Sequence, residues 1–153
     1  MNNCTNNVVK KIIIAKERLN VDRCIFTKFI NSEHTVFSNC LKWNRMQTHE
    51  EQGIVIPIEE NDVIIEKQQY SAVTDKLKEM LIAGACDTIY LCGLETDACV
   101  LSTAFDLFDF GIVPTILIDC CASARGESYH MAAKKIMERS FGTHNVVELC
   151  KCI

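Results

Sequence analysis

The sequence has little of what a secreted, membrane-bound or nucleic-acid-binding protein needs. Its 153 residues include two prolines and six glycines, and the aliphatic run at 12–14 is short and flanked by lysines. Such a run cannot form a signal-peptide core or a membrane span. The formal net charge of -4 leaves no basic surplus to neutralise phosphates. We therefore expect a cytoplasmic protein with no nucleic-acid partner and no membrane partner.

Cysteine is the one unusually frequent residue type, but its spacing is uninformative. There are ten cysteines and no Cys-x-x-Cys pair. A disulfide framework needs a secretory context, and a zinc ribbon needs the paired spacing. Most of the cysteines lie in apolar runs, which is typical of small buried hydrophobic residues. We expect no cofactor and no metal; an activated cysteine that acts as a redox sensor is an alternative.

Short β-type apolar runs alternate along the chain with longer helical ones. The expected strands are at 24–29, 63–66, 88–92, 112–118 and 146–149, and the expected helices are at 8–19, 71–83, 98–110 and 127–139. This alternation predicts an α/β fold, a three-layer sandwich whose mostly parallel, doubly wound sheet has about five strands. We treat 1–153 as a single domain. The long polar segment 31–53 is expected to form a lid or a pocket wall.

The segment from Leu91 to Val100 carries the strongest chemical signal. A buried strand reaches Gly93, and a helix begins near Asp97, a residue type suited to the N-cap. Cys99 then lies in the first helical turn, where unpaired amides and the helix dipole stabilise a thiolate. The same amides can hold the oxyanion that forms when a thiolate attacks a carbonyl. The alternative is a buried structural cysteine beneath a helix start.

Several segments, in the order found here, resemble those of the isochorismatase-like cysteine hydrolases, a family that includes nicotinamidases. The matching segments are 26–29, 66–72, 93–100 and 119–123, with His130 after them and Trp43 where members often carry a tryptophan. The resemblance covers nearly the whole chain. It implies an enzyme that hydrolyses a small amide, or a related C–N or ether-type bond, in a small-molecule substrate. It also favours a homo-oligomer.

The resemblance implies a Cys–Asp–Lys triad, with Cys99 as the nucleophile and Lys67 beside it to stabilise the thiolate. It further implies a cis peptide bond between Leu94 and Glu95, which turns the Glu95 amide toward the oxyanion together with the amide of Cys99. The loops at 31–45 and 122–126 are expected to form the pocket wall. The pocket-lining residues expected from the resemblance are Trp43, Thr96 and Ser123.

The aspartate of that triad has no counterpart in this sequence. In the family it ends the first strand, whereas here the first expected helix begins at residue 8 and no aspartate precedes it. In the family this first strand is central in the sheet, so its absence leaves two interior sheet edges. We expect these edges to pair with each other, to accept another segment or to stay open, unless the natural product is longer at this end. Candidate substitute bases are Glu66, Asp97 and Asp119. Each also has a structural interpretation: the Glu66 side chain points opposite to that of Lys67, Asp97 serves as an N-cap, and Asp119 forms a turn at the end of a strand.

Two observations limit the function further. The stretch 27–31 lacks the Asp-x-His pair that the nicotinamidase metal site needs, so nicotinamide is disfavoured as a substrate and no metal is expected. The absent aspartate favours a second hypothesis, a truncated and catalytically impaired relative that binds a small molecule or a partner subunit. The pairing of Lys67 with Cys99 favours the active hydrolase.

Overall fold

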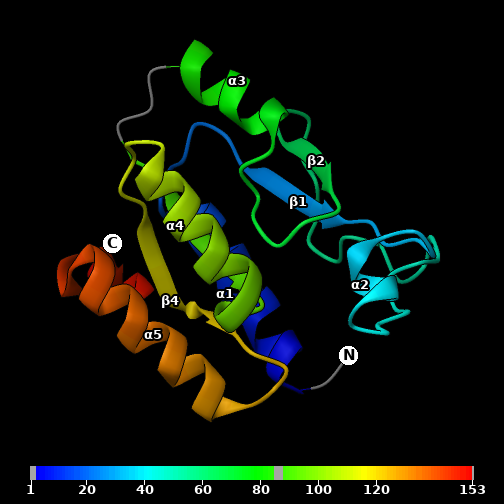
Figure 1. Ribbon diagram of the computed structural model, residues 1–153. Helices are drawn as coiled ribbons and strands as arrows, with labels where there is room; N and C mark the ends of the chain where they lie inside the picture. Colours follow the sequence, from blue (N-terminus) through cyan, green and yellow to red (C-terminus); the bar gives the residue numbers. More distant parts are fainter. Residues whose placement is uncertain (1–2, 85–87, 153) are drawn as a thin grey trace.

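The computed structural model describes residues 3–84 and 88–152 and shows helices packed around parallel strands (Figure 1). The strands are β1 (Ile25–Phe29), β2 (Val63–Lys67), β3 (Tyr90–Leu94), β4 (Thr115–Ala122) and β5 (Val146–Val147). The helices are α1 (Asn3–Arg18), α2 (Val36–Asn39), α3 (Asp75–Ala83), α4 (Leu101–Asp109) and α5 (Glu127–Phe141). In the described residues we find no helix with the length and apolarity required to cross a membrane.

The structure confirms the predicted α/β class and all five strands, with shifted boundaries. β4 begins at Thr115 because Pro114 lacks the N–H that a strand ladder uses. α3 begins at Asp75, four residues later than expected, because Thr74 caps it: the Thr74 hydroxyl accepts a hydrogen bond from the Leu77 amide. α2 was not predicted; it lies inside the long polar segment and is capped by Thr35.

The five strands form two parallel sheets, where the sequence predicts one. β1 pairs with β2 in one sheet, and the second sheet has the order β3-β4-β5. β1 and β3 therefore do not pair with each other. Among the described residues, one edge of β1 and one edge of β3 stay open, which is one of the outcomes expected for a missing central strand.

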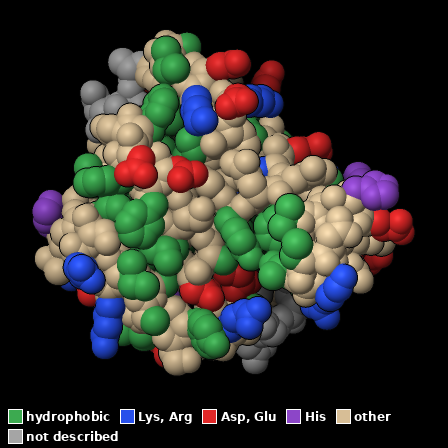
Figure 2. Space-filling model, in the orientation of Figure 1, with side chains coloured by type: hydrophobic (Ala, Val, Ile, Leu, Met, Phe, Trp, Pro, Cys, Tyr) green, Lys and Arg blue, Asp and Glu red, His purple; other side chains and the backbone are tan. Residues whose placement is uncertain are grey.

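Helices cover both faces of the three-stranded sheet. Val100 and Ala104 pack against Ile116 on one face, together with α5, while α1 covers the other face, where Ala15 packs against Leu117. The outer surface of α4 and α5 carries apolar side chains (Figure 2). Lys67 at the end of β2 contacts Cys99 just after β3, so the carboxyl ends of these two strands lie on the same side of the molecule, which is where ligands bind in folds of this kind.

Candidate active site

Lys67 and Cys99, which are 32 residues apart in the sequence, come together where β2 and β3 end. The Lys67 Nζ atom lies 3.5 Å from the Cys99 Sγ atom. It also donates to the carbonyl oxygens of Gln69 and Tyr70, both at 2.6 Å. Burial lowers the pKa of Lys67 below its ordinary value, and the interaction with the Cys99 thiolate opposes that shift. The arrangement is a buried amine held against a thiol.

Cys99 lies in η1 (Thr96–Val100), a single π-helical turn before α4. The carbonyl oxygen of Glu95 accepts from the amides of Ala98 at 3.2 Å and Val100 at 3.0 Å, which closes the turn around Cys99. Asp97 is therefore inside the turn and Glu95 holds the N-cap position, so the N-cap prediction for Asp97 is wrong. The wider turn starts the helical backbone earlier than the expected α-helix. Asp97 Oδ1 is buried and has no hydrogen-bond partner among the described residues.

The backbone just before this turn is unusual at two positions. The peptide bond between Leu94 and Glu95 is cis, and Gly93 has a φ of +128°. Nothing lies within 4 Å of where a Gly93 Cβ would be, so its backbone conformation, and not its small size, favours glycine. The Glu95 side chain accepts a hydrogen bond from the Ala124 amide, which ties the loop after β4 to the turn. Burial raises the pKa of Glu95.

The three residues expected to line the pocket lie in two separate places. Thr96 has no exposed surface, and its Oγ1 lies 2.9 Å from His130 Nδ1. Ser123 and His130 line a cavity of about 710 Å³ between α1 and the start of α5. Trp43 lies instead in the segment after β1, and its side chain is partly exposed.

Trp43 belongs to a group of four rings, which we call the aromatic cluster, beside the Lys67 amine. Its centroid separations run from 4.8 Å to 6.2 Å, and Lys67 Nζ lies 5.4 Å from the Phe29 ring centroid. Asn31 was not singled out in the sequence, yet it is buried and donates to the carbonyl of Trp43, which orients this segment. The aromatic cluster comprises Phe29, Phe37, Trp43 and Tyr70.

Thr103 is a second residue that the sequence did not single out. Its hydroxyl donates to the Cys99 carbonyl at 2.6 Å and accepts from the Ala72 amide at 2.8 Å. One buried side chain thus joins the nucleophile turn to the loop that follows Lys67. The only sequence signal is a polar residue four positions after Cys99, on the apolar face of the helix.

Thr103→Val is expected to loosen the Lys67–Cys99 pair while leaving the packing volume nearly unchanged. The change leaves the buried Ala72 amide and Cys99 carbonyl without the shared partner, at a cost of about 1–3 kcal/mol in the free energy of unfolding. Denaturant unfolding measures that loss, and the rate of Cys99 alkylation should fall several-fold. Ser102→Ala, at the neighbouring position, is the control, and equal effects of the two changes would contradict this role for Thr103.

Two of the three candidate substitute bases, Glu66 and Asp119, make structural contacts. Glu66 pairs with Lys28 at 3.6 Å, and its side chain is exposed, whereas Lys67 is buried. Asp119 pairs with Lys11 at 3.2 Å and accepts from the Leu149 amide at 2.8 Å; it lies within β4, so it does not form the expected strand-end turn. In the part of the chain that the structure describes, no three His, Cys, Asp or Glu side chains are grouped so as to hold a metal ion.

Comparisons with known proteins agree on one family. A family model described as the Isochorismatase domain matches residues 3–146. Isochorismatase domain-containing protein 2A of Mus musculus is 36% identical over 59 residues, 39% of this chain and 29% of the mouse protein, so the aligned part spans under a third of that relative.

Two solved structures have the same fold. An isochorismatase-like hydrolase from Alkaliphilus metalliredigens matches with a TM-score of 0.81 at 18% identity, over 97% of this chain and 84% of that one. N-carbamoylsarcosine amidase from Thermoplasma acidophilum matches with a TM-score of 0.77 at 21% identity, over 93% and 83% respectively.

Proposed function

This chain belongs to the isochorismatase family, and we propose that it is a cysteine hydrolase that cleaves a small amide, or a related C–N or ether-type bond, with Cys99 as the nucleophile. The observation that carries the proposal is the 3.5 Å separation of Lys67 Nζ and Cys99 Sγ. An ammonium group at this distance favours the thiolate over the thiol. The family's solved relatives include an enzyme named as an amidase, which supports the amide as substrate class.

For an amide, the Cys99 thiolate attacks the carbonyl carbon and forms the C–S bond. The amides of Glu95 and Cys99 stabilise the resulting oxyanion, because Cys99 lies in the turn that carries the sulfur and Glu95 directly precedes that turn. When the tetrahedral intermediate collapses, the C–N bond breaks, and the amine leaves with a proton taken from solvent. Water then hydrolyses the thioester, releasing the acid and restoring the thiolate.

The substrate's remaining atoms would lie against the segments beside the pair. The aromatic cluster offers an apolar wall next to Lys67, and we keep Trp43, Thr96 and Ser123 as pocket residues. We further propose that the enzyme acts in the cytoplasm as an oligomer.

A second candidate function is a catalytically impaired relative that binds a small molecule or a subunit. It is favoured by one observation: among the described residues, Lys67 makes no ion pair with a carboxylate, and no carboxylate bonds to Cys99. A missing general base typically costs about 10²–10⁴-fold in rate.

Alkylation by iodoacetamide at pH 7, followed by peptide mass spectrometry, separates the two candidates. We expect Cys99 to be modified first. Burial raises the pKa of Cys92 to about 12 and that of Cys120 to about 11, so those thiols stay protonated and serve as internal controls. Release of ammonia from a panel of small primary amides then tests hydrolysis. Uniformly slow alkylation would favour the impaired relative.

A further inference from the structure

Three phenylalanines, which we call the phenylalanine strip, join α4 to α5, and two of them face solvent. The ring centroids of Phe105 and Phe108 in α4 lie 5.0 Å and 5.4 Å from that of Phe141 in α5. Phe105 is still 37% exposed and Phe108 44%, whereas Phe141 is buried. Met131 and Ile136 of α5 are exposed as well, and Figure 2 shows apolar side chains gathered over these two helices. An exposed apolar surface that spans two helices is typical of an interaction site.

The charged side chains of α4 are both acidic. Asp106 and Asp109 follow the two exposed phenylalanines by one position, about 100° further around the helix, and both are exposed. They lie on the side opposite to the buried residues Ala104 and Leu107. Neither carboxylate makes an ion pair with another described residue. α4 therefore carries a negative ridge along its outer side.

The second half of α5 carries the opposite charge on its outer side. Lys135 and Arg139 are exposed, four residues apart, and lie on the side opposite to the buried Met137. Neither makes an ion pair with another described residue, whereas Lys134 and Glu138 pair with each other at 3.8 Å. α5 therefore carries a positive ridge.

α4 and α5 run in the same direction, with their later parts side by side. α4 connects β3 to β4 and α5 connects β4 to β5; these strands are parallel, and both helices pack on the same face of the sheet. The contact of Phe141 with Phe108 joins the later parts of the two helices. The negative and positive ridges therefore lie at the same level along the helices, on either side of the phenylalanine strip.

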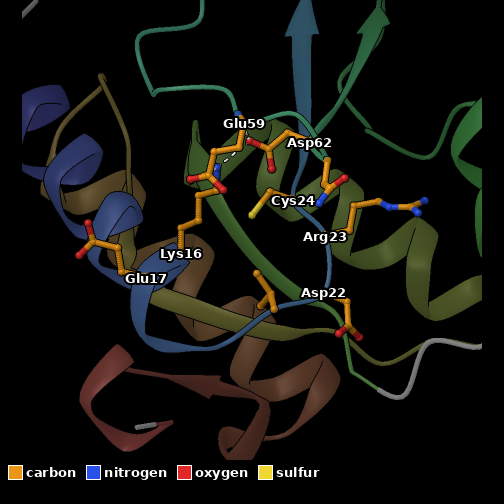
Figure 3. A pocket seen from close by; sticks show the side chains of 9 residues that line it. Lys16, Glu17, Asp22, Arg23, Cys24, Glu59 and Asp62 are labelled. Atoms are coloured by element: carbon orange, nitrogen blue, oxygen red, sulfur yellow. Dashed lines mark hydrogen bonds and ion pairs between the residues drawn. The ribbon is translucent and has the colours of Figure 1, made fainter.

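The charges beside α1, which covers the opposite face of the three-stranded sheet, are mixed instead. α1 borders a cavity of about 280 Å³ near the start of β1 (Figure 3). Lys16 pairs there with Asp62 at 2.6 Å and with Glu59 at 3.0 Å. The other charged residues that line this cavity include both signs: Glu17, Asp22 and Arg23. Charge is divided into a negative and a positive ridge on the α4–α5 face.

We propose that the α4–α5 face binds the same face of a second copy of this chain, with the two-fold axis parallel to the two helices. Rotation about such an axis exchanges α4 and α5 and keeps their direction, so the negative ridge of each copy meets the positive ridge of the other. The phenylalanine strips then meet at the centre of a four-helix arrangement and are removed from water. A two-fold axis perpendicular to the helices would place α4 against α4 and bring like charges together.

This inference specifies the surface of the oligomer proposed above and rests on that part of the proposed function. It does not depend on Cys99 being a catalyst, because the ridges and the phenylalanine strip lie outside the Lys67–Cys99 pair.

Reversing the charge of one ridge tests the pairing. Asp106→Lys with Asp109→Lys makes both ridges positive, and Lys135→Glu with Arg139→Glu makes both negative. Sedimentation equilibrium of the full chain measures the dissociation constant of the dimer. We expect each double variant alone to raise it at least about tenfold, because a two-fold dimer contains every pair twice. An equimolar mixture of the two double variants should form a heterodimer about as tight as the parent dimer, because ridges of opposite sign meet again.

Glu60→Lys with Glu79→Lys is the matched control, since both acids are exposed and lie outside α4 and α5. We expect this variant to dimerise like the parent. A parent that stays monomeric up to about 1 mM, double variants that dimerise as tightly as the parent, or a mixture that stays monomeric would each overturn the proposal. Cys99 alkylation is measured on the same samples, so failure of dimerisation is distinguishable from failure of the proposed hydrolase function.

Discussion

Cys99→Ala is expected to abolish hydrolysis of any amide substrate, by at least about 10³-fold in kcat/KM, while the protein still folds. The thiolate is the only group in the proposed mechanism that forms a bond to substrate, so no other residue replaces it. The Cys99 side chain is only partly buried, so its removal creates little cavity. Ammonia release measures the activity, and thermal unfolding measures the fold.

Cys150→Ala is the matched control, since Cys150 is an exposed free cysteine in the last turn of the described chain, outside the candidate site. We expect it to keep full activity and the same unfolding temperature. If Cys99→Ala retains the activity of the parent, the nucleophile assignment is wrong. If the parent and both variants lack activity on every amide, while Cys99 of the parent is still alkylated rapidly, the missing general base limits the rate of hydrolysis.

The sequence predicted the fold class because strand and helix patterns are local, whereas the pairing of Lys67 with Cys99 was implied by the family resemblance. Strand runs and helix periods are local, and Cys99 and Lys67 each lie in a recognisable segment beside a strand end. The two residues lie together in the structure, and their chemical roles stay predictions. The parallel strand pairings follow from the alternation of strands with helices.

What the sequence could not show depends on contacts between distant segments. Thr103 looks like an ordinary helix residue until its hydroxyl meets the Ala72 amide. Asn31 lies in a polar stretch, and its burial follows from bonds to the carbonyls of Trp43 and Arg45. The division into two sheets is likewise a property of the assembled strands, and no local pattern in β1 or β3 reports it.

Lys67→Met is expected to slow Cys99 alkylation at pH 7 by about 10²-fold, because it removes the ammonium group that favours the thiolate. Methionine keeps the length and most of the volume of the side chain, so the packing beside Phe29 is retained. The rate of iodoacetamide incorporation at Cys99, read by mass spectrometry, measures the effect. Lys28→Met is the matched control, since Lys28 pairs with exposed Glu66 and does not face the thiol.

The pH dependence of the same experiment gives an independent check. Burial lowers the pKa of Lys67, so its positive charge is fully present at low pH and is lost as pH rises through that lowered value. Free thiols ionise unaided above about pH 8.5. The ratio of parent to Lys67→Met alkylation rates should therefore fall as pH rises and approach one at high pH. A ratio that stays constant as pH rises would mean that Lys67 acts on the shape of the turn and not through its charge.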